Sequence, residues 1–455
     1  MKRLLVEYIE HKARELQRRV KVTLLGFGST NRAFLEALLP LENAYVTVRQ
    51  RGLSRGKISD SVAVYNGENA FSGLYEDVII PSPSVRRERL SIPYHAEVIT
   101  DYDLLFRAKQ KELFLISGSD GKSTTTELSS LLLQGSISHL FTGGNIGTPL
   151  ILADKDSEAF LLELSSFTLR YSLPMGGRAL LTNITPNHLD WHDGIEEYKN
   201  TKLSLVRRAD EPILNLDDEI SRSEARETHA FCLISSNLNH HNIARSYKTE
   251  HTVTVENDSV MLDGEMIIPL REIKRRERHN VSNLCSAIAM TIGYANRERI
   301  REVAHSFEGL SERCEFFDID GISFISSSID TSPERTRTTL EGLGREAIII
   351  LGGRGKRLPL EPLRSPLIKY AKRIAIYGEA AQEICVFLDS DPTLGAIPHN
   401  SFPRLAGAID YATMGVKPGD TVVLSPAATS YGEFENYSHR GKFFKQYILS
   451  KYQKI

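Results

Sequence analysis

Apolar runs of four to six residues recur along the chain, and segments with apolar residues at helical spacing lie between them. A run at 20–25 precedes one helical segment, and a run at 113–116 precedes another at 125–133. Further runs alternate with helical stretches in the C-terminal third, at 324–327, 347–351, 373–377 and 421–424. Strands that alternate with helices in this way predict parallel sheets with helices on both faces, an α/β fold.

The length of 455 residues corresponds to about three domains at roughly 150 residues each. Changes in the strand and helix pattern predict domains at 1–103, 104–309 and 310–455. No internal repeat or low-complexity segment interrupts this division.

Composition narrows the class of protein. The apolar fraction of 41% and the charged fraction of 25% are ordinary for a globular protein. A net charge of −2 gives no strong field, so we expect neither nucleic acid nor a lipid surface as a partner. Four cysteines without metal-ligand spacing indicate a reducing compartment. Residues 1–19 predict a charged amphipathic helix, not a signal peptide, and no stretch has the length of a membrane span, so we expect a cytoplasmic enzyme without membrane insertion.

The segment 116–124, Ile-Ser-Gly-Ser-Asp-Gly-Lys-Ser-Thr, is the strongest candidate for chemistry. It follows a strand and opens onto a helix, so backbone N–H groups, a helix N-terminus and Lys122 converge on one point, which suits a nucleotide phosphate. The Ser123 hydroxyl is placed to reach Mg²⁺ on the same phosphates. Ile116 occupies the first glycine position of the usual P-loop, so a plain strand–turn–helix corner stays open as the alternative.

The first block carries weaker signals of ligand binding. Its first strand runs into Gly-Phe-Gly-Ser-Thr-Asn at 26–31, the start of a Rossmann fold without the third glycine. A nucleotide site and a tight turn are both consistent with that segment. A later strand at 77–80 runs into Pro-Ser-Pro-Ser at 81–84, a loop at a strand's carboxyl end, where open α/β sheets bind ligands.

A single carboxylate, Glu163, interrupts the apolar run Leu-Leu-Glu-Leu-Ser-Ser-Phe at 161–167. Such a group is costly to bury unless it is paired or binds a cation. A glutamate at a strand end near a phosphate loop commonly orders Mg²⁺, and a structural ion pair is the alternative. The loop Gly-Gly-Asn-Ile-Gly-Thr-Pro at 143–149 is, taken alone, more typical of a β-turn.

Two later motifs add polar groups. Within Thr-Asn-Ile-Thr-Pro-Asn-His-Leu-Asp at 182–190, His188 and Asp190 are spaced to serve a second cation, although a buried structural histidine is the commoner case. The segment His-Asn-Val-Ser-Asn at 279–283 opens a helix and places Asn280 and Asn283 on one face. Their amides could bind a purine edge or a ribose, or could cap the helix.

Taken together, these motifs resemble those of the Mur ligase family in order and spacing. Leu-Ser-Pro-Ala-Ala-Thr-Ser at 424–430, followed by His-Arg-Gly at 439–441 and Phe444, extends the resemblance over residues 26–444. The strings are most similar to those of the family member that adds D-glutamate. The resemblance implies a Rossmann-like N-terminal domain for a UDP-linked substrate, a central P-loop ATPase-type mononucleotide-binding domain, and a Rossmann-like C-terminal domain for the amino acid.

The resemblance also implies an activity. The protein would be a monomeric, ATP-dependent carboxylate–amine ligase of peptidoglycan precursor synthesis. It would add D-glutamate to UDP-N-acetylmuramoyl-L-alanine, with Mg²⁺ as cofactor. A carboxylate is a poor electrophile, and its phosphorylation to an acyl phosphate supplies a good leaving group. Both steps gather negative charge, so cations and N–H donors would dominate catalysis.

The family's functional positions carry over to this sequence by their motifs. The positions that match its catalytic residues are Lys122, Glu163, His188 and Lys202. Those that match its ATP-binding residues are Gly118, Ser119, Asp120, Gly121, Lys122, Ser123, Thr124, Asn280, Asn283 and Arg313. Those that match its UDP-substrate-binding residues are Gly28, Ser29, Thr30, Ser82, Asn145 and Ser165. Those that match its D-glutamate-binding residues are Thr331, Lys356, Ser430 and Tyr437. Those that match its metal ligands are Ser123, Glu163, His188 and Lys202, the last as a carbamate.

The sequence departs from the family's pattern at several places. Ser327 stands where the family has an acid, and an acid stands instead at Asp330. Arg49 lies near the expected uracil site, where an acid is common, so the uracil contacts are poorly predicted. The remaining departures are Asn187 for an aspartate, Ser84 for a glycine and Gly432 for an acid.

Two alternatives remain open. The first is a related ligase of different amino-acid specificity or a folylpolyglutamate synthase-like enzyme, but the Asp-Asn-Pro-Arg string of the diamino-acid-adding members and the strings of the alanine-adding members are absent. The second is a nucleotide-binding regulatory or assembly protein without catalysis, which the departure at Ser327 favours. A pure binding module would not need the set Lys122, Glu163, His188, Lys202 and Lys356.

Overall fold

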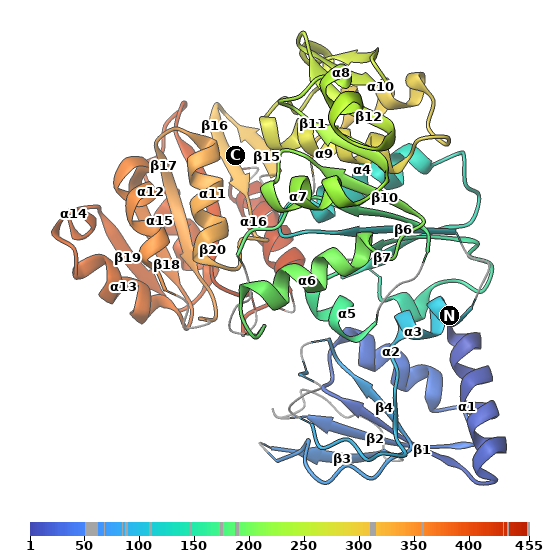
Figure 1. Cartoon of the computed structure of the whole chain (residues 1–455). Helices are drawn as coiled ribbons and strands as arrows, with labels where there is room; N and C mark the ends of the chain where they lie inside the picture. The colour runs from blue at the N-terminus through green and yellow to red at the C-terminus, as the bar shows by residue number, and fades with distance from the viewer. Residues whose placement is uncertain are drawn as a thin grey trace. The chain divides into compact units, whose positions relative to one another are not determined.

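The computed structural model describes residues 1–50, 62–67, 69–83, 85–86, 90–108, 112–145, 148–172, 176–186, 191–309, 315–355, 359–430, 432–434 and 436–452. The chain forms two compact units, Met1–Phe307 and Glu308–Ile455. The described residues build three sheets, of which two belong to the first unit and one to the second (Figure 1).

The first sheet is parallel, with the strand order β3-β2-β1-β4-β5. Its strands are β1 (Val20–Leu25), β2 (Ala44–Gln50), β3 (Ala63–Asn66), β4 (Val78–Pro81) and β5 (Glu97–Val98). The helices of this region are α1 (Lys2–Leu16), α2 (Ser29–Leu38) and α3 (Asp101–Arg107). The buried Asn31 amide donates to the carbonyl oxygens of Leu25, Gly26 and Ile80, and so joins β1 to β4 where the strand order reverses. Reversals of this kind form the ligand-binding crevice of open α/β sheets.

The second sheet has the order β14-β13-β12-β11-β10-β9-β6-β8-β7. Its strands are β6 (Glu112–Ser117), β7 (Leu140–Gly144), β8 (Ala159–Glu163), β9 (Arg178–Leu181), β10 (Glu211–Asn215), β11 (Ala230–Ser235), β12 (Thr249–Glu256), β13 (Ser259–Leu262) and β14 (Glu265–Pro269). Its helices are α4 (Lys122–Leu133), α5 (Ser166–Tyr171), α6 (Ile195–Val206), α7 (Glu219–Glu227), α8 (His240–Ser246), α9 (Arg278–Met290) and α10 (Arg297–Ser306), with short 3-10 turns at Leu150–Leu152 and Leu270–Glu272.

The third sheet has the order β15-β16-β20-β17-β18-β19. Its strands are β15 (Glu315–Ile319), β16 (Ile322–Ser326), β17 (Ala347–Gly352), β18 (Ala371–Tyr377), β19 (His399–Phe402) and β20 (Thr421–Ala427). Its helices are α11 (Pro333–Leu343), α12 (Arg364–Tyr370), α13 (Ala381–Asp389), α14 (Pro392–Gly395), α15 (Leu405–Ala412) and α16 (Tyr437–Tyr452), with a 3-10 turn at Glu361–Leu363.

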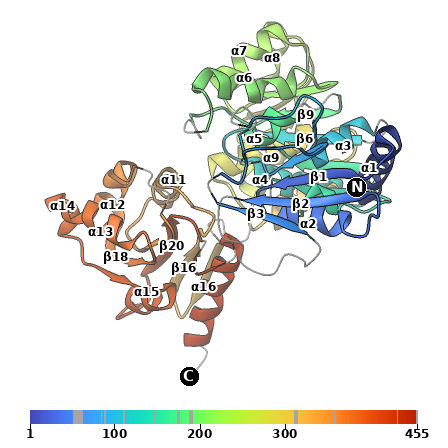
Figure 2. The same ribbon diagram turned by 90° about the horizontal axis from the view of Figure 1, so that it is seen from below.

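Two hydrophobic clusters cover opposite faces of this third sheet, whose elements Figure 2 shows in orange and red. Alternate residues of β17 point to opposite faces. Ile349 and Leu351 pack with α11, α12 and α13, whereas Ile348 and Ile350 pack with α15 and α16. The predicted doubly covered sheet is therefore confirmed here.

The first unit is held by a core that continues from one sheet to the next. A single cluster includes Val22 and Leu24 of β1, Leu105 of α3, and Leu115 and Leu162 of the second sheet. Because this apolar surface is continuous, the first two sheets fall within one compact unit. The predicted division of the chain at residues 103 and 309 stays a prediction.

The α/β class predicted from the sequence is confirmed, but the purely parallel arrangement was wrong at two sheet edges. Strand β12 pairs antiparallel with β13, and β13 with β14. In the third sheet β15 pairs antiparallel with β16. These strands are joined by tight turns such as the one at Asn257 and Asp258, which need no crossover helix. Within the described ranges, none of the helices combines the length and apolar character needed to cross a bilayer.

The departure at Arg49 has a structural explanation. Arg49 is 3% exposed at the end of β2, and its Nη2 and Nε donate to Oε1 of Glu76 at 2.9 and 3.0 Å. Nη1 donates to the carbonyl oxygens of Ala70 and Ser72, and the guanidinium lies 4.6 Å from the ring centroid of Tyr65. The arginine therefore ties the segment 69–76 to the strand end.

Replacing Glu76 with Gln should lower the free energy of unfolding, because it leaves a buried guanidinium without its counter-charge. The expected loss is about 3 kcal/mol. The exposed pair of Arg3 and Glu7 supplies the control, and Glu7→Gln should change stability by about 0.5 kcal/mol or less. Urea unfolding followed by circular dichroism measures both variants. Equal effects in the two would contradict the structural role given to the buried pair.

Candidate functional site

The loop between β6 and α4 depends on two glycines. Gly118 has a φ of +147°, and a Cβ there would lie 1.8 Å from Oγ1 of Thr182. Gly121, the residue before α4, has a φ of +80°, and its Cβ would lie 2.4 Å from Oδ1 of Asn283. Any side chain at either position would strain the backbone and displace a neighbour. Both glycines of the predicted phosphate loop are thus required by its geometry.

Hydrogen bonds tie this loop to the segment that follows β9. The Ser119 N–H donates to the Asn183 carbonyl at 2.8 Å, and the Asp120 N–H donates to the Asn183 side chain at 2.9 Å. Thr182 Oγ1 donates to the Asp120 carbonyl at 2.7 Å. The hydroxyls of Ser119 and Tyr198 lie 2.8 Å apart. Sequence reasoning did not assign these contacts, although 182–190 was recognised as a motif.

Two lysines meet at one carbonyl oxygen of the loop. Lys122 Nζ donates to the carbonyls of Gly118 and Ser119 at 3.0 and 2.8 Å, and Lys202 Nζ donates to Gly118 at 2.6 Å. Lys202 comes from α6 and is only 2% exposed. Its burial, and then the positive charge of Lys122, hold the pKa of Lys202 well below its usual range. The structure therefore places two lysine side chains, of which Lys202 is disfavoured as a cation, at the end of β6.

Glu163 ends β8, which pairs with β6 in a register that sets Glu163 beside Ile116. It is 1% exposed, and its Oε1 accepts a hydrogen bond from Asn145 Nδ2 at 2.9 Å. Its Oε2 is buried and has no hydrogen-bond partner among the described residues. A buried carboxylate oxygen left in this state fits a cation ligand. No trio of His, Cys, Asp and Glu side chains spaced for a metal occurs among the described residues.

Of the remaining residues predicted for ATP, Ser123, Thr124 and Asn283 lie at the same loop or at the start of the helix that follows it. Ser123 and Thr124 lie in the first turn of α4. Asn283 of α9 packs against Gly121, and its Oδ1 accepts a 3.5 Å hydrogen bond from Thr125. Asn280 donates to Glu277 at 3.0 Å, and both asparagines are more than nine-tenths buried. The place of Asn283 beside the loop agrees with a nucleotide site, while the roles of both asparagines stay predictions.

Several predicted site residues lie outside the described part of the chain. These are His188, Arg313 and Lys356, together with the side chain of Ser29. The departures at Asn187 and Ser84, and the predicted partner Asp190, fall there too. Their predicted roles stay predictions.

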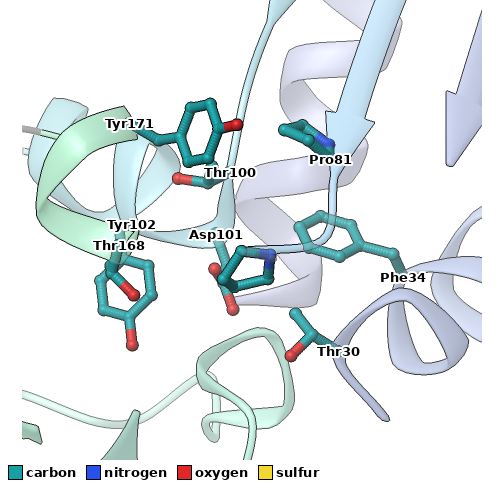
Figure 3. A pocket seen from close by; sticks show the side chains of 9 residues that line it. Thr30, Phe34, Pro81, Thr100, Asp101, Tyr102, Thr168 and Tyr171 are labelled. Carbon is teal, nitrogen blue, oxygen red and sulfur yellow. The ribbon is translucent and has the colours of Figure 1, made fainter. Parts of the chain in front are cut away.

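The residues predicted for the UDP-linked substrate follow the ends of β1, β4, β7 and β8. Gly28 precedes α2 and Ser82 follows β4, while Ser165 caps α5 by accepting the Thr168 N–H at 3.0 Å. Thr30 lines a cavity of about 20 Å³ formed with β4, α3 and α5 (Figure 3). That volume holds roughly one water, so the cavity is too small to be the substrate site.

In the second unit, the fully buried Arg440 links the segments that carry residues predicted to bind D-glutamate. Its guanidinium donates to the carbonyls of Ser328 and Ala428 at 2.7 and 3.0 Å, and Ser328 Oγ donates to the Tyr437 carbonyl at 2.8 Å. These contacts hold together the segments that carry Thr331, Ser430 and Tyr437. Sequence reasoning quoted Arg440 only as part of a string and missed this role.

Ser430 also lines a cavity of about 540 Å³ at the carboxyl ends of β17, β18, β19 and β20.

The departure from the family pattern at Asp330 does not line this cavity. Oδ2 of Asp330 accepts hydrogen bonds from Thr339 and Ser425, each at 2.7 Å, and the residue is 5% exposed. This carboxylate is therefore engaged in holding α11 to β20.

Comparison with known proteins finds relatives along most of the chain. The Mur ligase middle domain model matches residues 116–291. A UDP-N-acetylmuramoylalanine–D-glutamate ligase of Acetivibrio thermocellus is 31% identical, over 94% of this chain and 96% of the relative. A protein of the same name from Ruminiclostridium cellulolyticum is 30% identical over 82% of each chain.

Solved structures agree at the level of fold. The UDP-N-acetylmuramate–alanine ligase MurC of Thermotoga maritima superposes with a TM-score of 0.59 at 17% identity, covering 95% of this chain and all of that one (100%). The MurF ligase of the same organism, in complex with ADP, gives 0.54 at 14% identity and covers 96% of each chain. The extent of the sequence match to relatives of one name, together with the shared fold, shows that the chain belongs to the Mur ligase family.

Proposed function

We propose that the protein is an ATP-dependent ligase that adds D-glutamate to UDP-N-acetylmuramoyl-L-alanine in the cytoplasm. One observation carries the proposal: a phosphate loop, two lysines and a buried carboxylate, one of whose oxygens has no hydrogen-bond partner within the described ranges, converge at the ends of β6 and β8. Relatives named for this reaction are 30–31% identical along most of their length. A loop that only bound a nucleotide would not require the buried lysine and carboxylate.

The proposed reaction has two steps. A carboxylate oxygen of the muramoyl-alanine substrate attacks the γ-phosphorus of ATP, the bond from phosphorus to the ADP oxygen breaks, and an acyl phosphate forms. The amine nitrogen of D-glutamate then attacks the acyl carbon, and inorganic phosphate leaves as the amide forms. The amine loses a proton in this second step. Both transition states carry extra negative charge on oxygen, which fixed cations and N–H donors stabilise.

The residues at the end of β6 would supply those donors and cations. The N-terminus of α4 and the backbone of residues 118–123 would cradle the phosphates, and Lys122 would exchange its two carbonyl contacts for phosphate oxygens. Tyr198 and Asn183 would keep the loop in shape, because both bind it through hydrogen bonds. Asn280, Asn283 and Arg313 would contact the nucleotide.

Ser123, Glu163, His188 and a carbamylated Lys202 would hold Mg²⁺, which neutralises charge on the phosphate oxygens when bound. Carbamylation forms a bond between the lysine nitrogen and the carbon of CO₂ and releases one proton. Only the neutral amine reacts, and the lowered pKa of Lys202, caused first by burial, favours that form. The carbamate anion would replace a cation that otherwise repels the metal.

In the second unit, Thr331, Lys356, Ser430 and Tyr437 would bind D-glutamate. The hydrogen bonds of Arg440 to Ser328 and Ala428 support this proposal, because they fix the segments on either side of these residues. In the first unit, Gly28, Ser29, Thr30, Ser82, Asn145 and Ser165 would bind the UDP-linked substrate.

The decisive assay measures phosphate release with ATP and Mg²⁺. Release should require both UDP-N-acetylmuramoyl-L-alanine and D-glutamate, because each proposed step consumes one of them. A panel of amino acids in place of D-glutamate tests the specificity. Turnover that ignores D-glutamate would refute the proposal, and turnover with another amino acid alone would point to a related ligase.

Replacing Lys122 with Ala should remove a charge contact worth about 3 kcal/mol in the transition state, which is more than a hundredfold in kcat/KM. The exposed Lys155, in a turn before β8, offers a matched control whose alanine variant should keep wild-type turnover. Steady-state kinetics compares the two. A folded Lys122→Ala variant with near-normal turnover would show that this ammonium does not act on the phosphates.

Replacing Lys202 with Ala should abolish activity, and a short carboxylate such as acetate should restore part of it by standing in for the carbamate. Lys199 lies one turn away on α6 and pairs with Glu196 at 2.7 Å, so Lys199→Ala serves as the control. Activity is titrated with acetate in both variants. Full activity of Lys202→Ala without acetate would contradict the carbamate role, as would the absence of any rescue.

A further inference from the structure

A chain of hydrogen bonds, buried at Ser166 and His192, joins these two residues to Glu197. None of the three was singled out as a site residue from the sequence. Ser166 Oγ lies 2.9 Å from Nε2 of His192, and Nδ1 of His192 bonds to Oε2 of Glu197. Ser166 and His192 are each 3% exposed. The imidazole is further enclosed by the rings of Trp191 and Tyr198, with centroids at 4.8 and 5.1 Å.

A serine, a histidine and a carboxylate in this order are also the parts of an activated nucleophile. Here the serine hydroxyl and the imidazole are both shielded from solvent, so no substrate reaches them. The arrangement is therefore not a hydrolytic centre. Its role is to connect α5, which begins at Ser166, with α6, which carries Glu197.

Ser166 begins α5, three residues after Glu163 at the end of β8. Glu197 lies in α6, the helix that also carries Tyr198 and Lys202. The chain of hydrogen bonds thus runs from the strand end with the free carboxylate oxygen to the helix that contacts the phosphate loop. His192 is the side chain at its centre.

The proton positions follow from the neighbours. A carboxylate only accepts, so Nδ1 of His192 carries the proton and donates to Glu197, which leaves Nε2 to accept from the Ser166 hydroxyl. Burial lowers the pKa of His192, with Arg170 and Lys202 adding to the effect, although the bond to Glu197 opposes it. The neutral imidazole therefore completes both hydrogen bonds. Glu197 is further held by Thr201 Oγ1 at 2.8 Å and by Arg170.

We propose that His192 is a positioning residue that holds the start of α5 against α6 and so fixes the distance between the Glu163 carboxylate and the Lys202 amine. The inference rests on the proposed function, in which those two groups face the same cation. Loss of the Ser166 hydroxyl frees one end of the chain without emptying the core, because a single oxygen is removed. The groups around the cation then lose their spacing while the nucleotide loop itself stays intact.

The test compares Ser166→Ala with Ser221→Ala in the full-length protein. Ser221 on α7 is likewise fully buried, and its hydroxyl has no hydrogen-bond partner among the described residues, so its loss matches the change in packing alone. Calorimetry measures ADP binding at rising Mg²⁺. The concentration of Mg²⁺ at half-saturation should rise about tenfold in Ser166→Ala and stay at the wild-type value in Ser221→Ala.

Two further measurements separate positioning from loss of fold. Trp191 is the only tryptophan of the sequence and lies beside His192, so unchanged emission in Ser166→Ala shows that the cluster is intact. His192→Gln keeps a group for Ser166 and should lie between wild type and Ser166→Ala in its Mg²⁺ dependence.

An unchanged Mg²⁺ dependence in a folded Ser166→Ala variant would overturn the positioning role, as would an equal change in Ser221→Ala. ADP binding needs neither D-glutamate nor the UDP-linked substrate. Failure of the ligase assay would therefore refute the proposed function without deciding this comparison.

Discussion

The carbonyl oxygen of Gly118 accepts hydrogen bonds from the side-chain nitrogens of Lys122 and Lys202, and the elements of the candidate site meet at that contact. Burial removes the hydration of a Lys202 ammonium and the charge of Lys122 repels it, so the pKa of Lys202 lies well below its usual range. The carbonyls of the loop accept hydrogen bonds from both side chains, and Glu163 of the neighbouring strand favours positive charge there. A polyphosphate with its metal is the kind of ligand that such a centre accommodates, because it brings the compensating charge.

That constraint explains the density of hydrogen bonds in the surrounding elements. The loop has to keep the backbone conformation of its glycines. Thr182 and Asn183, which follow β9, and Tyr198 of α6 hold it there through hydrogen bonds. The strand end with Glu163 is held by Asn145 on one side and, through Ser166, by α6 on the other. The rigid hydrophobic core beneath, which spans the first two sheets, gives these contacts a fixed base.

The second unit also contains a buried cationic side chain, Arg440. Among the described residues Arg440 forms no ion pair, and its donors are satisfied by the carbonyls of Ser328 and Ala428, the Ser328 hydroxyl and Tyr377. Five donors in a rigid fork can join several backbone segments at once, which lysine cannot do. Two departures from the family pattern also form internal hydrogen bonds. Asp330 accepts one from Ser425 in the second unit, and Arg49 donates one to Glu76 in the first.

The sequence by itself determined the α/β class, the strands β1, β6 and β17 with the turns that follow them, and the positions of Lys122 at a helix start and Glu163 at a strand end. These are local features, set by apolar periodicity and by glycines that only certain turns require. It did not determine the antiparallel edges, the burial of Lys202, or the links through Arg440 and His192. Those depend on which strands become neighbours and which side chains are enclosed between them, and contacts between residues far apart in sequence leave no periodic signal along the chain. Only the tertiary structure decided them, because hydrogen-bond partners and desolvation are properties of packed elements.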